Sequence, residues 1–71
     1  MEKFNIMGPA DLVSETIQHF KNGQERIVTD VFPTKDPTQR DVNVTIIDER
    51  VDEFYEWCEA RETKGLVFKM I

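Results

Sequence analysis

The sequence predicts an α+β fold with six elements in the order strand, helix, strand, strand, helix, strand. Two stretches repeat their apolar residues with the period of an amphipathic helix, and four short stretches are rich in the β-branched and aromatic residues of strands. Glycine or proline stands at several of the boundaries between these stretches. The length of 71 residues predicts a single domain, residues 1–71.

The first strand and the first helix meet at a Gly-Pro pair. Residues 3–7 alternate apolar and polar side chains, as a short strand does. Pro9 is favoured at the first position of a helix and Gly8 can cap it, so we expect the helix to begin there. An Asn-Gly pair at 22–23 predicts its end near Lys21. Thr16 lies beside the apolar stripe of this helix. The stripe consists of Ala10, Val13, Ile17 and Phe20.

The middle of the chain predicts a β-hairpin. Residues 26–32 are rich in β-branched side chains, and residues 41–47 alternate cleanly. The loop between them, 33–40, contains two prolines and three charged residues and no apolar residue. Its cations, Lys35 and Arg40, are candidate loop contacts for a partner, since loops often carry function. A solvated connector explains the same residues.

The last third predicts a second helix and a final strand. Asp48 can cap the helix, and Gly65 predicts its end. Residues 66–71 then form the last strand. The helix carries an apolar stripe at positions i, i+3, i+4 and i+7: Val51, Phe54, Tyr55 and Cys58.

This order of elements predicts a ferredoxin-like βαββαβ sandwich. Two right-handed crossovers around a hairpin give a four-stranded antiparallel sheet with both helices on one face. In this arrangement the first and third strands are central, which agrees with the regular alternation of residues 41–47.

The acidity of the chain is concentrated in the second helix. The net charge is −5. Residues 48–62 hold seven acidic and two basic residues, a balance of −5, and the other 56 residues hold seven of each. An acidic balance repels phosphates and anionic lipids, so we expect neither nucleic acid nor a membrane as a direct partner.

The sequence also predicts a cytoplasmic protein. No apolar run approaches the roughly 20 residues of a membrane-spanning helix, and the first residues lack the basic start and apolar stretch of a secretion signal. The single cysteine cannot form an internal disulfide, which favours a reducing compartment.

Catalysis is not expected. Cys58 lies in an apolar stripe beside acidic side chains, whereas a reactive thiol needs exposure and positive surroundings. His19 is the only histidine, and without a second histidine or an accessible cysteine it makes neither a metal site nor a nucleophile pair. We expect a boundary histidine, a buried structural cysteine, no enzyme activity, no cofactor and no metal.

The open face of the predicted sheet offers polar side chains along its two central strands: Lys3, Asn5, Asn43 and Thr45. RNA-binding members of this fold stack bases on aromatic residues at such positions, and none is present here. We expect a solvated face or part of a homodimer interface.

The second helix carries the main candidate site. At 100° per residue its carboxylates fall on one outward face, and Trp57 lies at the border between Arg50 and Arg61, which can stack on it. Because a run of like charges destabilises a helix, we interpret this face as a surface for a basic partner, although a solvated face explains the same residues. The candidate partner-binding residues are Glu49, Asp52, Glu53, Glu56, Trp57 and Glu59.

The start of the first helix resembles a known family. Pro9-Ala10-Asp11-Leu12 is similar to the Pro-Gly-x-Leu turn of ACT domains, small ligand-sensing modules of this length and element order, with Ala10 in place of the glycine. The resemblance implies a regulatory domain that binds a small molecule near residues 7–12 and acts as a dimer.

Three functions follow as hypotheses. The first is a small acidic non-catalytic interaction or regulatory module that binds a protein with a basic surface, for example inhibiting a nucleic-acid-binding protein by occupying its site. The alternative is an ACT-like small-molecule sensor. The third is a subunit that only assembles, through the last strand and the polar sheet face.

Overall fold

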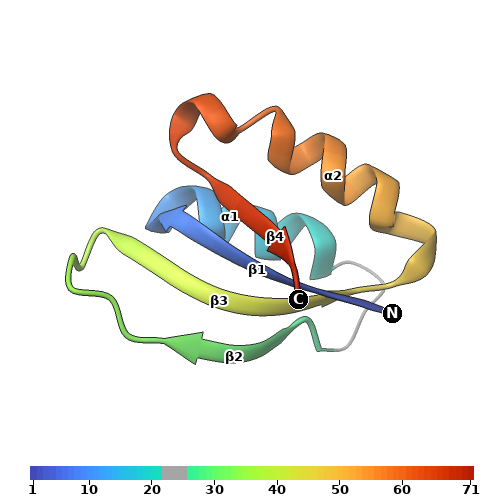
Figure 1. Cartoon of the computed structure of the whole chain (residues 1–71), viewed down its shortest axis with the longest axis horizontal. Coiled ribbons are helices and arrows are strands. Elements are labelled where there is room, and N and C mark those ends of the chain that lie inside the picture. Colours follow the sequence, from blue (N-terminus) through green and yellow to red (C-terminus); the bar gives the residue numbers. More distant parts are fainter. Residues whose placement is uncertain (22–25) are drawn as a thin grey trace.

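The computed structural model describes residues 1–21 and 26–71. The elements follow the predicted order, with two short 3₁₀ turns flanking the second helix: β1 (Glu2–Pro9), α1 (Ala10–Lys21), β2 (Val28–Phe32), β3 (Gln39–Ile46), η1 (Asp48–Arg50), α2 (Val51–Glu59), η2 (Glu62–Lys64) and β4 (Val67–Met70). The four strands form one sheet in the order β2-β3-β1-β4, all neighbours antiparallel. Both helices pack on the same face of this sheet (Figure 1). The predicted ferredoxin-like α+β arrangement is therefore confirmed, with β1 and β3 at the centre.

The core lies between the sheet and the helices. Along the central strands, Phe4 pairs with Val44 and Ile6 with Val42, so their side chains point to the helix face. The rings of Phe4 and Phe54 lie 4.6 Å apart, which joins β1 to α2. The buried apolar side chains are Phe4, Ile6, Leu12, Val13, Phe20, Ile27, Val42, Val44, Ile46, Phe54, Cys58 and Leu66.

The junction of β1 and α1 differs from the prediction. Gly8 and Pro9 end the strand, paired with Arg40 and Gln39, and the helix begins only at Ala10. The N–H of Ala10 donates to the backbone oxygen of Thr38 at 2.8 Å. The loop of the hairpin, and not Gly8, therefore accepts the hydrogen bond from the first N–H of the helix.

The buried side of α1 includes Leu12, which the predicted apolar stripe left out. Leu12 is buried, together with Val13, Thr16 and Phe20, while Ala10 is only half-buried. The hydroxyl of Thr16 donates to the backbone oxygen of Leu12, so its polar atom is satisfied inside the core. The Asn-Gly stop predicted at 22–23 lies outside the described residues.

The hairpin forms as predicted: β2 ends at Phe32 as expected, and the other strand boundaries differ by one or two residues. β2 begins at Val28, which pairs with Val44, and an irregularity in the register lies between Val28 and Asp30. β3 begins two residues earlier than predicted, since Gln39 pairs with the end of β1. The connecting loop is accordingly shorter than predicted, 33–38.

The second helix starts and ends differently from the prediction. Asp48 does not cap it: the chain makes the 3₁₀ turn η1, and the Asp48 carboxylate pairs with the N-terminal ammonium group at 2.8 Å. The α-helix ends at Glu59, and Gly65 instead ends the second 3₁₀ turn, η2, with φ at +101°. A Cβ on Gly8 would lie 2.8 Å from the Gly65 oxygen, so the close approach of these two backbones requires glycine at position 8.

Candidate functional site

The carboxylates of the second helix are divided between two roles. Asp48 and Glu53 are already engaged, with the N-terminus and with side chains around the end of α1. The other four are exposed and form no ion pair with the residues that the structure describes: Glu49, Asp52, Glu56 and Glu59. We refer to these four carboxylates as the acidic face.

Glu53 holds the two helices together. Its carboxylate accepts two hydrogen bonds from Arg50, at 2.9 and 3.1 Å, and lies 2.8 Å from Nε2 of His19 on α1. The Arg50 guanidinium, followed by His19, lowers the pKa of Glu53 from 4.5 to about 2. Its charge is therefore used within the molecule.

Trp57 also belongs to the contact between the helices. The His19 ring stacks on it with centroids 4.0 Å apart, and the Arg61 guanidinium lies 3.4 Å from the ring centroid. Two planar groups this close cannot share one face, so both faces of the indole are covered. Its N–H donates to Thr16 at 2.9 Å. Arg50, which we expected beside the indole, lies over Phe20 instead.

The loop before β3 is stabilised by its own polar groups. Arg40 donates to the backbone oxygens of Pro37 and Gln39, at 2.7 and 2.8 Å. The Asp36 carboxylate accepts from both the backbone and the hydroxyl of Thr38, which lowers the pKa of Asp36. Lys35 is exposed at the tip. Of the two loop cations, Arg40 thus supports the turn and Lys35 extends from it.

Cys58 and His19 occupy the environments that the sequence predicts. Cys58 is fully buried, and burial raises the pKa of its thiol to about 12. His19 lies at the boundary between solvent and the helix contact. Within residues 1–21 and 26–71, no three His, Cys, Asp or Glu side chains come together as a metal site would require. Of the described helices, none is long and apolar enough to cross a membrane.

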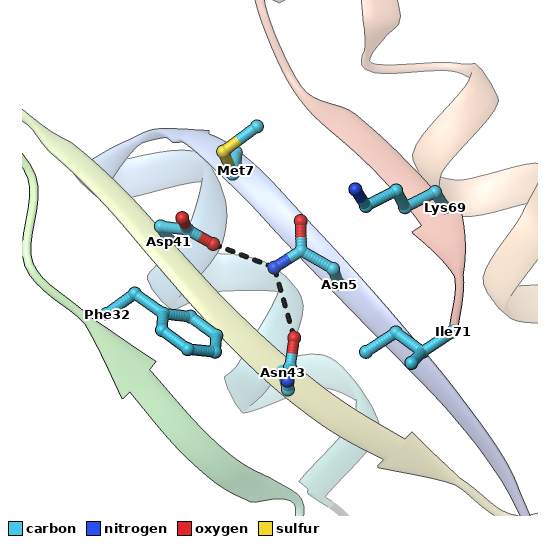
Figure 2. Close-up of a pocket in the computed structure, with 7 residues that line it drawn as sticks. All are labelled: Asn5, Met7, Phe32, Asp41, Asn43, Lys69 and Ile71. Atoms are coloured by element: carbon cyan, nitrogen blue, oxygen red, sulfur yellow. Dashed lines mark hydrogen bonds between the residues drawn. The ribbon is translucent and has the colours of Figure 1, made fainter.

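The open face of the sheet has a hydrogen-bonded polar centre. Asn5, on β1, is 9% exposed, and its amide N–H₂ group donates to Asp41 at 2.7 Å, to Asn43 at 3.1 Å and to the Val42 oxygen at 3.2 Å. The Asn43 amide in turn donates to Asp30 at 3.1 Å. The Asn5 amide oxygen points away from Asp41 and Asn43 (Figure 2). No residue in the described part of the chain donates to it, so it is an open acceptor at the centre of the face.

Apolar side chains from the sheet edges surround this centre. We expected a polar face from the central strands, but the edge strands add Phe32, on β2, and Ile71, just after β4, while Met7 closes one end (Figure 2). Together they form an open depression of about 350 Å³. It is lined by Asn5, Met7, Phe32, Asp41, Asn43, Lys69 and Ile71.

Sequence reasoning missed this depression because it followed only the central strands. The alternation of β2 gives the signal: in register with β3, Asp30 and Phe32 face the same side as Asn43 and Asp41. In β4, Lys69 pairs with Asn5 and so shares its face. The depression is assembled from all four strands, and only their order in the sheet brings these residues together.

Comparisons with known proteins support the fold. No protein-family model matches the chain, and no curated protein matches it. One solved structure is similar, a formyltetrahydrofolate deformylase from Pseudomonas putida KT2440, with a TM-score of 0.52 and 17% sequence identity. The match covers 97% of this chain and 27% of that one, so this chain spans about a quarter of the length of the matched protein. At this identity the likeness shows the α+β fold and nothing of the activity.

Proposed function

We propose that this chain is a non-catalytic, ACT-like regulatory domain that binds a small molecule in the depression on its open sheet face. One observation carries the proposal: apolar side chains and polar groups, among them the Asn5 amide oxygen and the Lys69 ammonium, line a single hollow. Its volume, about 350 Å³, falls within the range of about 300–1,000 Å³ typical of small-molecule sites.

The lining indicates the chemistry of the ligand. The open oxygen of Asn5 and the Asp41 carboxylate accept hydrogen bonds, and the Lys69 ammonium attracts a negative group. Met7 belongs both to this lining and to the segment in which the ACT resemblance implies a ligand site.

Thermal shift measurements across a panel of amino acids and nucleotides test the proposal. A ligand at saturating concentration should raise the Tm, since binding to the folded state alone stabilises it. Phe32→Ala should weaken the shift because Phe32 lines the depression. Val31→Ala is the matched control, since Val31 is the preceding residue of β2, 71% exposed and absent from the lining. A flat response throughout the panel would overturn the proposal.

A second candidate function rests on the four exposed carboxylates of the acidic face, which form no ion pair within the described residues. Here the chain binds a protein with a basic surface, and the carboxylates set the rate of association. The test is the triple variant Asp52→Lys, Glu56→Lys, Glu59→Lys, which leaves the Glu53 contacts intact. Basic proteins should bind the wild type at low salt and not the variant. Equal recovery by both would contradict this function.

A further inference from the structure

The open face of the sheet carries more exposed apolar surface than its polar centre suggests. Both helices cover the opposite face, and no segment within residues 1–21 and 26–71 covers this one (Figure 1). Pairing registers place four apolar side chains here, between 39% and 62% exposed: Met7, Phe32, Val67 and Ile71. Exposed apolar side chains gathered on one face are a mark of an interaction surface.

The charges of this face balance, and two of them are unpaired. Lys3 and Asp30 form an ion pair at 3.3 Å. Asp41 on β3 and Lys69 on β4 form no ion pair within the described part of the chain. They lie on opposite sides of Asn5 (Figure 2). A partner surface with charges of one sign only would attract either Asp41 or Lys69 and repel the other. A surface that carries one positive and one negative charge can pair with both.

A second copy of the chain has that surface. In the strand order β2-β3-β1-β4, a two-fold axis parallel to the strands and between β3 and β1 places β4 of each copy over β2 of the other. Lys69 of one copy then faces the side of the other copy where Asp41 and Phe32 lie. The symmetry makes this contact twice, as a self-complementary dimer interface requires.

We propose that the protein forms a symmetric homodimer through its open sheet faces, with Lys69 of each copy paired to Asp41 of the other. The aliphatic stem of Lys69 packs on the Phe32 ring, and the apolar side chains of the two faces bury one another. The Asn5 amide oxygen, open in the single chain, accepts from the incoming ammonium group. The dimer goes beyond ligand binding, and it uses polar groups that also line the ligand site, Asn5, Asp41 and Lys69. A ligand in the depression would therefore compete with dimerisation.

Charge reversal tests the proposal with a sharp expectation. Lys69→Glu places two negative charges together in each contact, and Asp41→Lys places two positive charges together, so each variant should dimerise at least about tenfold more weakly than the wild type. Mixing the two variants restores an opposite-charge pair at both contacts. Sedimentation velocity over a range of concentrations should show two weakly associating variants that form a heterodimer when mixed.

Two controls keep the result interpretable. Lys64→Glu makes the same change of net charge in η2, away from the open face, and should dimerise like the wild type. Asp41→Lys removes the Asn5 contact, so circular dichroism must show that the variant is folded. If it is not, Phe32→Glu replaces it as the second disruptive variant, since Phe32 makes no polar contact in the depression.

Several results would overturn the proposal. A wild type that stays monomeric at all concentrations excludes the dimer. A dimer that Lys69→Glu and Lys64→Glu weaken equally, or that neither weakens, uses another surface. Ligand binding is measured separately. A monomer that still binds a small molecule supports the proposed function and refutes the dimer. A dimer whose Tm no ligand raises supports the dimer and refutes the proposed function.

Discussion

The imidazole ring of His19 lies 4.0 Å from the indole of Trp57, centroid to centroid, and within 15° of parallel to it. The Arg61 guanidinium covers the opposite face, and its Nη2 bonds to Glu15 on α1 at 3.2 Å. Nε2 of the same imidazole lies 2.8 Å from the Glu53 carboxylate. Three planar groups stacked in this way tie α1 to α2 at the surface of the helix layer, above a core that is otherwise apolar.

Removing His19 should loosen this stack. Stacked aromatic pairs contribute about 0.5–1.5 kcal/mol, so His19→Ala should lower the free energy of unfolding by about 1 kcal/mol in urea titrations. Trp57 is the only tryptophan. Its emission should shift to longer wavelength and become more accessible to acrylamide, because one ring face becomes exposed. Lys21→Ala, in the same last turn of α1, should change neither; an unchanged emission in His19→Ala would contradict the stack.

Acid should destabilise the protein partly through Glu53. The pKa of Glu53 is about 2 in the folded chain against an ordinary value of 4.5, so the unfolded chain takes up the proton more readily. The stabilisation from its charge is complete above about pH 5 and is lost as the pH falls towards 2. Glu53→Gln should therefore flatten the dependence of urea midpoints on pH over this interval. Glu56→Gln is the control, and identical profiles for both variants would refute the assignment.

Gly8→Ala should destabilise the chain more than Gly65→Ala. The added Cβ at position 8 meets the Gly65 oxygen at 2.8 Å and the Leu66 Cα at 3.2 Å, both on the backbone, whereas at position 65 the nearest atom is 3.5 Å away. Gly65→Ala carries only the cost of its positive φ, about 1 kcal/mol, and Gly8→Ala should lose about 2–3 kcal/mol. Thermal and urea unfolding of the two variants measure the difference. Equal losses would mean that the close approach costs nothing.

Cys58 should resist alkylation in the folded chain. Burial raises the pKa of its thiol to about 12, so almost no thiolate is present at pH 8, and the side chain is inaccessible. Iodoacetamide should react at least about a hundredfold more slowly with the native chain than with the chain in urea, at the rate set by opening of the core. As the only cysteine, it gives a single readout by mass spectrometry. Labelling at the same rate in both states would contradict the buried environment.

Local patterns were enough to predict the fold. The alternation in residues 41–47 and the apolar stripe of the second helix each identify a core face without knowledge of the partner element. The boundaries depended on tertiary contacts instead. Gly8 and Pro9 have the composition of a helix start, but the paired strand β3 holds them in the sheet. Asp48 has the composition of a cap, and the N-terminus takes its carboxylate.

Parts of the candidate sites could likewise be predicted from local patterns, whereas other parts depend on tertiary contacts. The carboxylates of the second helix were visible in the sequence because helical periodicity alone places them on one outward side, although only the structure shows that Asp48 and Glu53 are in ion pairs. The engagement of Glu53 by His19 was not visible, because those residues are 34 positions apart and meet only when the helices pack. The depression on the sheet depends on Phe32 and Lys69, which come together only through the order of the strands.

The segregation of charge has a consequence for how two molecules meet. The excess of −5 sits in residues 48–62, on the helix side, while the open sheet face is electrically balanced. Two copies approaching helix side to helix side repel each other, and at physiological salt this repulsion acts over about 8 Å. The same field turns tumbling molecules so that their neutral sides lead. Repulsion between the acidic helices therefore favours encounters in which the open sheet faces of two copies meet.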